Sequence, residues 1–292
     1  MKKYLPYFFL LMLLVVMSSS KVITLFTKDV FTTFSYSLLP TLAPSIFLDY
    51  LFINSGGLET IYNFLLKRFK NTKVIYRHLI VILGLISGTP TLANYVHDSI
   101  NKNYLSKKEG EVILSSFILP SFPFIYGVII PKLNSIQIIV LLFLLYVPSS
   151  LYYLFSLKNE NQNIEVSFIK SEGNYLHKSI VDTAKTLLIL IGTILLFSLP
   201  FPLLNMFFNK NISYSILGIL EFTSSSLYIV NNLSSTLFFI LVCILSFSSC
   251  SVYSQISILC PSISIKKILK KRFLFLGINV LIIGILFIFK IL

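Results

Sequence analysis

The chain reads, from Val74 to Asp98, VIYRHLIVILGLISGTPTLANYVHD. Its apolar arm, over about 74–87, is too short to cross a bilayer, which takes about 20 apolar residues. The arm ends in Ser87-Gly88-Thr89-Pro90, and a polar arm then leads to a cluster of basic residues. This order predicts a re-entrant hairpin over 78–104. Irregular backbone at membrane depth is tolerated only where protein or a wet cavity surrounds it.

The composition of the whole chain is that of a membrane protein. Of 292 residues, 55% are hydrophobic and 12% are charged, and the mean hydropathy is +0.86. An average soluble domain carries about 25% charged residues, so a water-soluble fold is excluded. The length allows about seven to nine segments of bilayer depth. We therefore predict an all-α fold, a polytopic transmembrane helical bundle.

Apolar segments follow one another through the sequence. They span approximately residues 4–18, 30–53, 74–87, 111–130, 135–156, 180–208, 213–230, 235–261 and 273–292. The first resembles a signal peptide but lacks an A-x-A cleavage site, so we expect residues 1–24 to stay as an N-terminal transmembrane helix. The polar loop 157–178 then separates a first half, 25–156, from a second half, 179–292.

The charge of the chain is strongly positive. Its 24 Lys and Arg exceed its 11 Asp and Glu and give a net charge of +13. Basic residues gather in short loops between apolar runs: Lys67, Arg68, Lys70, Lys73, Arg77, Lys102, Lys107, Lys108, Lys266, Lys267, Lys270, Lys271 and Arg272. This positive-inside pattern predicts that the loops 66–77 and 157–178 are cytoplasmic and face the anionic headgroups of the lipid bilayer. It does not indicate nucleic-acid binding, because no soluble face carries the charge.

Three later apolar segments are also interrupted. Segment 111–130 contains Pro120-Ser121-Phe122-Pro123, where two prolines remove backbone donors and stop a regular helix. The other two segments contain Glu221–Ser226 and Ser246–Ser251. Discontinuous helices of this kind are typical of the substrate sites of transporters.

The pattern at 78–108 occurs again at 238–272. Both stretches contain an apolar run, small hydroxyl residues, a short polar-aromatic arm and a Lys cluster. Interrupted segments at matching places predict two related halves, each with a re-entrant hairpin. Because a Lys cluster follows both, the sequence leaves open whether the repeat is inverted or parallel.

Polar groups inside apolar segments are costly and therefore mark functional sites. Glu221 stands in mid-segment, where a carboxylate facing a cavity would bind a proton, Na⁺ or a ligand hydroxyl; the alternative is a Glu bonded inside the bundle or at a helix end. The turn Ser87–Thr91 offers hydroxyls and the positive end of a half-helix to an anion; the alternative is a loop that only packs. The predicted substrate-binding residues are Ser87, Gly88, Thr89, Pro90, Thr91, Asn94, Ser121, Glu221, Thr223, Ser224, Ser248, Ser249, Ser251 and Gln255.

No motif indicates catalysis or a bound metal. The three histidines are scattered without metal-ligand spacing, and neither G-x-S-x-G nor H-E-x-x-H occurs. We therefore predict no enzyme, no metal and no cofactor. Asp49, Asp182 and Lys185 stand near segment ends, where both a solvated role at the membrane interface and a functional role stay open.

Several stretches resemble one known family. They are Gly84–Pro90 (GLISGTP), Leu105–Glu111 (LSKKEGE), Pro123–Gly127 (PFIYG), Leu220–Thr223 (LEFT) and Ser251–Gln255 (SVYSQ). In this order, over about residues 25–290, the chain resembles the sporulation integral membrane protein family. That family includes a stage V sporulation protein proposed to carry dipicolinic acid, and it is allied to nucleoside-recognition (gate) domains and concentrative nucleoside transporters. The chain departs from the family at Leu92, Leu119, Ser248-Ser249 and Tyr253, where the family has Gly, Asn, Gly-Gly and His.

The resemblance implies a transporter of a small aromatic anion, foremost dipicolinic acid during sporulation. Its place would be the bacterial cell membrane, as the mother-cell or outer forespore membrane. Tyr95, Phe122 or Tyr253 would stack on the ring of the substrate. The alternatives are a transporter of nucleosides or other small metabolites, and a non-transporting membrane scaffold protein of sporulation. A homo-oligomer is compatible with the resemblance, and any coupling ion stays open.

Overall fold

A computed structural model of the chain describes residues 7, 10, 20–69, 72–158, 166 and 174–289. Every regular element within these ranges is a helix, so the predicted all-α class is confirmed. Six of the described helices are long and apolar enough to cross a membrane: Ile23–Asn54, Lys107–Lys132, Ser135–Ser156, Tyr175–Phe207, Ser235–Leu259 and Ile265–Ile288. These spans make the chain an integral membrane protein. Most of the predicted N-terminal helix over 1–24 lies outside the described residues.

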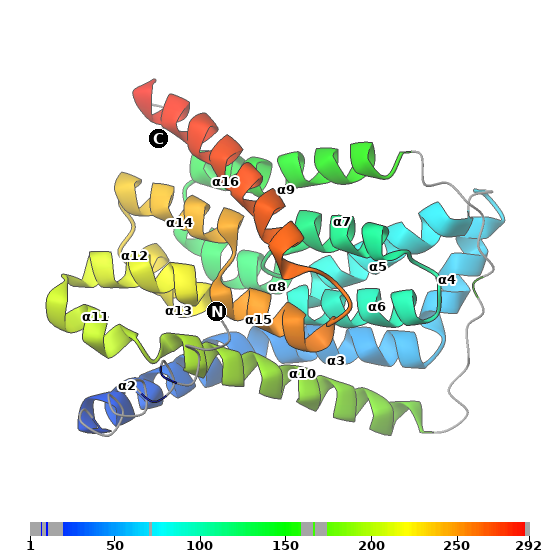
Figure 1. Cartoon of the computed structure of the whole chain (residues 1–292), viewed down its shortest axis with the longest axis horizontal. Coiled ribbons are helices and arrows are strands. Elements are labelled where there is room, and N and C mark those ends of the chain that lie inside the picture. The colour runs from blue at the N-terminus through cyan, green and yellow to red at the C-terminus, as the bar shows by residue number, and fades with distance from the viewer. Residues whose placement is uncertain are drawn as a thin grey trace.

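The first of these spans is one long helix. It consists of α2 (Ser20–Thr33), the π-helical turn η1 (Phe34–Leu38) and α3 (Leu39–Asn54). A shorter helix, α4 (Gly57–Leu66), follows after Gly56, which has a φ of 88°. Figure 1 shows α2 and α4 at opposite ends of the bundle, and we call these the α11 end and the α4 end after the helices that lie there.

The first predicted hairpin segment forms a pair of adjacent antiparallel helices. α5 (Thr72–Ser87) runs from the α4 end into the middle of the bundle, and α6 (Thr89–Asn101) runs back (Figure 1). Gly88 makes the turn with a φ of 99°, which glycine adopts without steric penalty. Near the open end of the pair, a 2.8 Å hydrogen bond joins the hydroxyls of Tyr76 and Ser99.

The next span is broken in its middle. α7 (Lys107–Phe117) runs inward from the α4 end, and the backbone is irregular from Ile118 to Ser121. The span continues to the α11 end as α8 (Phe122–Phe124), η2 (Ile125–Ile129) and η3 (Ile130–Lys132). The prolines of this segment stop the regular helix, as predicted. An unbroken helix, α9 (Ser135–Ser156), then returns to the α4 end.

The remaining helices fill the second part of the chain. They are α10 (Tyr175–Ser198), α11 (Phe201–Phe207), α12 (Lys210–Leu220), α13 (Phe222–Asn231), α14 (Ser235–Phe247), α15 (Cys250–Leu259) and α16 (Ile265–Ile288). α12 and α13 pack side by side and turn at Glu221, whereas α14 and α15 follow one another through a break at Ser248 and Ser249. Figure 1 shows that α12–α13 opens to the α11 end, opposite the end to which α5–α6 opens.

The second helix pair lies elsewhere than the sequence pattern predicts. The pattern predicts a hairpin at 238–272, but Ser235–Leu259 forms a single broken span. The helix pair of this part of the chain is α12–α13, around Glu221. Small hydroxyl residues followed by a Lys cluster occur both at a hairpin turn and at a break in a spanning helix. The pattern therefore does not separate the two structures.

The two ends of the bundle differ in charge. The described residues of the first two basic clusters belong to elements at the α4 end, and the third cluster lies at the start of α16, the end of that helix nearer to α4 (Figure 1). There, Lys267 of α16 pairs with Glu111 of α7 at 3.0 Å. At the α11 end, Phe26 of α2 stacks on Phe201 of α11 with ring centroids 4.9 Å apart. The apolar core runs between the two ends through all the spans.

Candidate functional site

The interruptions of the helices meet around one central cavity of about 50 Å³. The first long helix, α10, both helix pairs and both broken spans contribute to its wall. The lining residues are Leu38, Leu42, Ser87, Gly88, Thr89, Pro90, Leu119, Pro120, Ser121, Phe124, Leu190, Ile194, Phe222, Thr223, Leu245, Ser248, Ser251, Val252 and Gln255. Segments far apart in the sequence are thus brought together at one place.

Hydrogen bonds hold two segments against the break in the first broken span at 118–121, which we call the first break. One is the turn at Gly88 (the first turn), and the other is the break at Ser248 and Ser249 (the second break). Thr89 Oγ1 donates to the carbonyl of Leu119 at 3.1 Å, and Ser248 Oγ donates to the carbonyl of Ile118 at 2.8 Å. Both carbonyls lie where α7 has ended, so they have lost their helical partners. The hydroxyls at the turn and the break satisfy backbone groups that would otherwise be buried unpaired.

Most of the predicted substrate-binding residues line this cavity. They are Ser87, Gly88, Thr89, Pro90, Ser121, Thr223, Ser248, Ser251 and Gln255. Gln255 is held in place by α10, because its Nε2 donates to Thr193 Oγ1 at 2.8 Å. The breaks that the sequence marks as functional therefore share one wall.

The other predicted residues do not line the cavity. Thr91 is fully buried, and its hydroxyl donates to a backbone carbonyl of the same turn at 2.7 Å. The hydroxyls of Ser249 and Ser251 are bonded to each other at 2.7 Å. Ser224 contributes its backbone N–H to a helix cap, and Asn94 lines a separate cavity.

Glu221 caps a helix and does not line the cavity. It is the N-cap of α13, and its carboxylate accepts the backbone N–H groups of Thr223 at 2.7 Å and Ser224 at 2.8 Å. The side chain is completely buried, and both oxygens are bound. The positive end of α13 also stabilises its charge. Of the two interpretations of Glu221, the residue at a helix end describes this geometry, and the free ligand-binding carboxylate does not.

Two half-helices begin at the cavity without a side-chain cap. They are α6, whose N-cap is Gly88, and α15, whose N-cap is Ser249. Among the helices that begin away from the cavity, α7, α9, α10, α12 and α14 have a side-chain cap, whereas α4, α11 and α16 have none. Uncapped N–H groups, together with the partial positive charge of a helix N-terminus, suit an anion.

A buried carboxylate on α3 joins the turn of the first pair. Asp49 is 5% exposed, and its Oδ2 accepts the Ser87 hydroxyl at 2.5 Å and the Tyr95 hydroxyl at 2.6 Å. Its Oδ1 has no hydrogen-bond partner. Of the two roles left open for Asp49, the solvated one is therefore wrong. Its partners lie 38 and 46 positions further along the chain, and position within an apolar segment does not reveal them.

Arg272 of α16 lies directly behind the second break. It is only 1% exposed, although the sequence places it in a basic cluster between apolar runs. Its Nη2 donates to the carbonyl of Leu245 at 3.3 Å and to Ser248 Oγ at 3.5 Å, and both residues line the cavity. Its Nε and Nη1 have no partner, and no Asp or Glu among the described residues forms an ion pair with it. An uncompensated positive charge thus stands beside the cavity.

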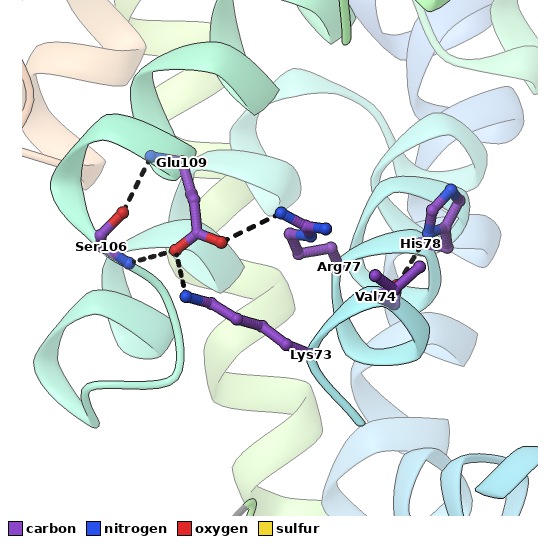
Figure 2. Close-up of polar contacts among 6 residues, drawn as sticks. All are labelled: Lys73, Val74, Arg77, His78, Ser106 and Glu109. Atoms are coloured by element: carbon purple, nitrogen blue, oxygen red, sulfur yellow. Dashed lines mark hydrogen bonds and ion pairs between the residues drawn. The ribbon is translucent and has the colours of Figure 1, made fainter. Parts of the chain in front are cut away.

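A second buried charged cluster lies away from the cavity, between α5 and α7 (Figure 2). Glu109 is completely buried and pairs with Lys73 at 3.0 Å and with Arg77 at 3.1 Å. Its carboxylate also accepts the backbone N–H of Ser106 at 2.8 Å, which completes a capping box at the start of α7. Lys73 and Arg77, which the sequence places in the basic loop 66–77, thus belong to α5 and fasten it to α7.

The aromatic residues expected to stack on a substrate do not line the cavity. Tyr95 and Tyr253 use their hydroxyls in hydrogen bonds within the protein, and Phe122 packs on other rings. Phe124 and Phe222 line the cavity instead, edge to face with ring centroids 5.7 Å apart. They come from α8 and α13, pack on each other and offer apolar surface to a ring.

A second cavity, of about 250 Å³, lies between α3, α6, α10 and α15. Its lining is polar and consists of Tyr50, Asn94, Tyr95, Asp98, Asp182, Lys185, Thr186, Ile189 and Leu259. Asp182 and Lys185, which the sequence places near segment ends, are wall residues of this cavity. Asn94 belongs here too, where it donates to the hydroxyl of Tyr50 at 2.7 Å.

Comparison of the chain with protein-family models, with curated proteins and with solved structures finds no match. The family resemblance seen in the sequence therefore stays an expectation, and the function must be argued from geometry. Among the described residues, no group of three or more His, Cys, Asp or Glu lies together so as to hold a metal ion.

Proposed function

We propose that the chain is a membrane transporter that binds a small organic anion in the central cavity and carries it across the bilayer. The observation that carries this proposal is the pair of uncapped half-helices, α6 and α15, which come from distant parts of the chain and begin at one cavity. Discontinuous helices bind the substrates of many transporters near the bilayer midplane. An anion bound here satisfies N–H groups that no side chain caps.

The proposal includes two related halves in inverted orientation. α5 to α9 and α12 to α16 each contain a helix pair, a broken span and a long helix, and the two pairs open to opposite ends (Figure 1). Each pair would then be a re-entrant hairpin, as in inverted-repeat transporters. The basic cluster at 266–272 follows a broken span and lies at the end of its helix that is nearer to α4 and to the other clusters. Inverted halves therefore agree with the charge pattern, and the α4 end is cytoplasmic.

An aromatic anion suits the cavity best. The positive ends of α6 and α15 and the uncompensated guanidinium of Arg272 favour carboxylates. Phe124 and Phe222 favour an aromatic ring. Dipicolinate, a planar ring with two carboxylates, has this chemistry and is the cargo that the sequence resemblance implies. Nucleosides lack the charge, so they are the weaker candidate.

The central cavity of the described conformation is small. A single water needs about 10–15 Å³, so a cavity of about 50 Å³ holds a few waters and no aromatic ring. Substrate binding therefore requires the cavity to widen, while the Thr89–Leu119 and Ser248–Ile118 hydrogen bonds keep the turn at Gly88 and the break at Ser248 at its wall.

Uptake of labelled dipicolinate into liposomes that contain the purified protein tests this proposal. We expect uptake well above that of empty liposomes, with competition by unlabelled pyridine dicarboxylates and none by nucleosides. Competition by nucleosides alone would make the chain a nucleoside transporter. A folded protein that takes up neither compound would contradict transport and favour the scaffold.

Two serine variants refine the same assay. Ser251→Ala removes a hydroxyl from the cavity wall and should lower uptake. Ser215→Ala removes an exposed hydroxyl of α12, whose bond to the Asn211 carbonyl lies within the helix, and should leave uptake unchanged. Equal effects of the two would mean that the cavity is not the site.

A further inference from the structure

Asp49 lies between the two cavities. Ser87, which donates to Asp49 Oδ2 at 2.5 Å, lines the central cavity. Tyr95, which donates to the same oxygen at 2.6 Å, lines the second cavity. A hydrogen-bonded chain from Ser87 through Asp49 to Tyr95 thus connects the proposed substrate site with a polar cavity of about 250 Å³.

The carboxyl group of Asp49 is not compensated by its surroundings. It is 5% exposed, its Oδ1 has no partner, and no Lys, Arg or His of the described residues lies within ion-pair distance. An ionised carboxylate without a counter-charge is costly to bury, whereas a carboxylic acid is neutral. The transport scheme above gives this group no role.

The ionisable groups around Asp49 come from its own helix and from α6 and α10. They are Tyr50, Tyr95, Asp98, Asp182 and Lys185. α5 contributes the hydroxyl of Ser87, since Lys73 and Arg77 are bound to Glu109, and His78 is exposed with its Nδ1 at 2.7 Å from the carbonyl of Val74. η1 and α8, which also pack on α3, carry no charged residue, and Glu59, the one charged residue of α4, makes no hydrogen bond to Asp49.

We propose that Asp49 binds a proton that is carried together with the substrate anion, an inference that rests on the transport function proposed above. The proton comes from water in the second cavity. Tyr95 relays it by accepting a proton on its oxygen while it passes its own to Asp49 Oδ2. The carboxylate becomes a carboxylic acid, and the same proton returns to water after the substrate has left.

Proton binding and anion binding favour each other at this site. Asp49 is bonded to Ser87, which directly precedes Gly88, the N-cap of α6. While ionised, Asp49 repels an anion at that helix end, and once neutral it does not. By thermodynamic linkage, the bound anion raises the affinity for the proton, and the bound proton raises the affinity for the anion by the same factor. The result is symport, in which the proton and the anion cross the membrane in the same direction.

A proton fits this site better than a metal cation. A metal ion needs several oxygen ligands, about six to eight for Ca²⁺. Asp49 Oδ1 has no hydrogen-bonding neighbour, and Oδ2 is already held by two hydroxyls. A proton requires only one of these oxygens.

Infrared spectra of the purified protein test proton binding without any transport. On acidification, the wild type should gain the carbonyl band of a buried carboxylic acid, and Asp49→Asn should lack it. The amide keeps the shape of the side chain and still accepts from Ser87 and Tyr95. Glu59→Gln is the matched control and should keep the band. A band unchanged in Asp49→Asn overturns the proposal; if that variant does not fold, Asp49→Glu must shift the band.

Uptake measurements test the coupling. With labelled dipicolinate, an inward proton gradient should raise accumulation by up to about tenfold for each pH unit. Asp49→Asn should lose this dependence while it still exchanges internal for external dipicolinate. Uptake that follows a Na⁺ gradient and ignores pH overturns proton coupling. If the wild type carries no dipicolinate but shows the Asp49 band, the proton site stands and the proposed cargo fails.

Discussion

The helix pairs α5–α6 and α12–α13 are built alike, but their turns differ. The first turn is Gly88, with a φ of 99° and no side-chain cap on the helix that follows. The second is Glu221, with an extended φ of −143°, and its carboxylate caps the following helix twice. The first turn leaves the N–H groups of Thr89 and Thr91 without a side-chain cap, and Pro90 has no N–H group, whereas the second turn carries its own carboxylate cap.

The difference teaches that a carboxylate at a turn is a poor marker of a binding site. Glu221 occupies, at the start of α13, the place that a substrate anion would take at the start of α6. The second turn is also held by its own pair, since Ser225 Oγ donates to the carbonyl of Tyr214 at 2.6 Å. We therefore expect ligand binding to depend more on the first pair than on the second.

The largest difference between the pairs is expected in the side of the membrane to which each pair opens. Cysteines are placed at Asn103, beside the open end of the first pair, and at Asn232, beside that of the second, after the native Cys243, Cys250 and Cys260 are replaced with Ser. Because the pairs open to opposite ends, an impermeant thiol reagent should label Asn232→Cys in intact cells and Asn103→Cys only after permeabilisation. Labelling of both positions in intact cells would contradict the opposite orientation of the two pairs.

Gly88→Ala should damage the first turn severely. An alanine at this positive φ is strained, and its Cβ would lie 3.3 Å from the Cβ of Ser121. We expect a loss of about 1–3 kcal/mol in unfolding free energy and loss of uptake, as α6 shifts from the cavity. Gly192→Ala on α10, where an added Cβ meets nothing within 4 Å, is the control and should raise stability slightly. Thermal unfolding and uptake measured together distinguish the two variants.

Glu221→Gln sharpens the comparison from the other side. Gln accepts one backbone N–H in place of two, so unfolding free energy should fall by about 1–2 kcal/mol. Uptake for each folded molecule should stay close to that of the wild type, because Glu221 is not part of the cavity wall. Normal thermal stability with uptake abolished would instead make Glu221 a ligand for the substrate, and the turns would then share one role.

The smallest effect is expected from the matched threonines. Thr89→Val removes the hydrogen bond to Leu119, which holds the first turn on the first break. A neutral hydrogen bond contributes about 0.5–1.5 kcal/mol, so we expect uptake to fall by about 2- to 10-fold. Thr223→Val, which has no bond to that break to lose, should cost less. A larger loss for Thr223→Val would reverse the order of the two turns.

Local sequence carries the fold class and the positions of the breaks. The turn at Gly88 and the gap before Phe122 follow from glycine and proline, whose backbone effects act within a few residues. Most of the polar residues predicted as substrate-binding line the cavity, because they lie at these locally determined breaks. These features need no knowledge of the distant parts of the chain.

Distant contacts account for what the sequence did not reveal. Lys73 and Arg77 are typical loop residues until Glu109 is brought against them. Arg272 likewise stands in a run of exposed lysines and is buried only because α16 crosses the second break. The sequence pattern predicts the second helix pair at 238–272 and not at α12–α13, because hydroxyl residues occur both at turns and at breaks.

The Glu109 cluster bears on when the first helix pair can leave the membrane-insertion machinery. Glu109 follows Arg77 by 32 positions, so the ribosome completes α5 and α6 before the partner of their buried charges exists. Until α7 emerges, two positive side chains would enter the bundle without compensation, which is costly. We expect the first helix pair to stay with the insertion machinery until then, and Glu109→Gln to prolong that stay. Crosslinking of stalled nascent chains of increasing length would reveal a release point just past α7, and release before Glu109 is made would contradict it.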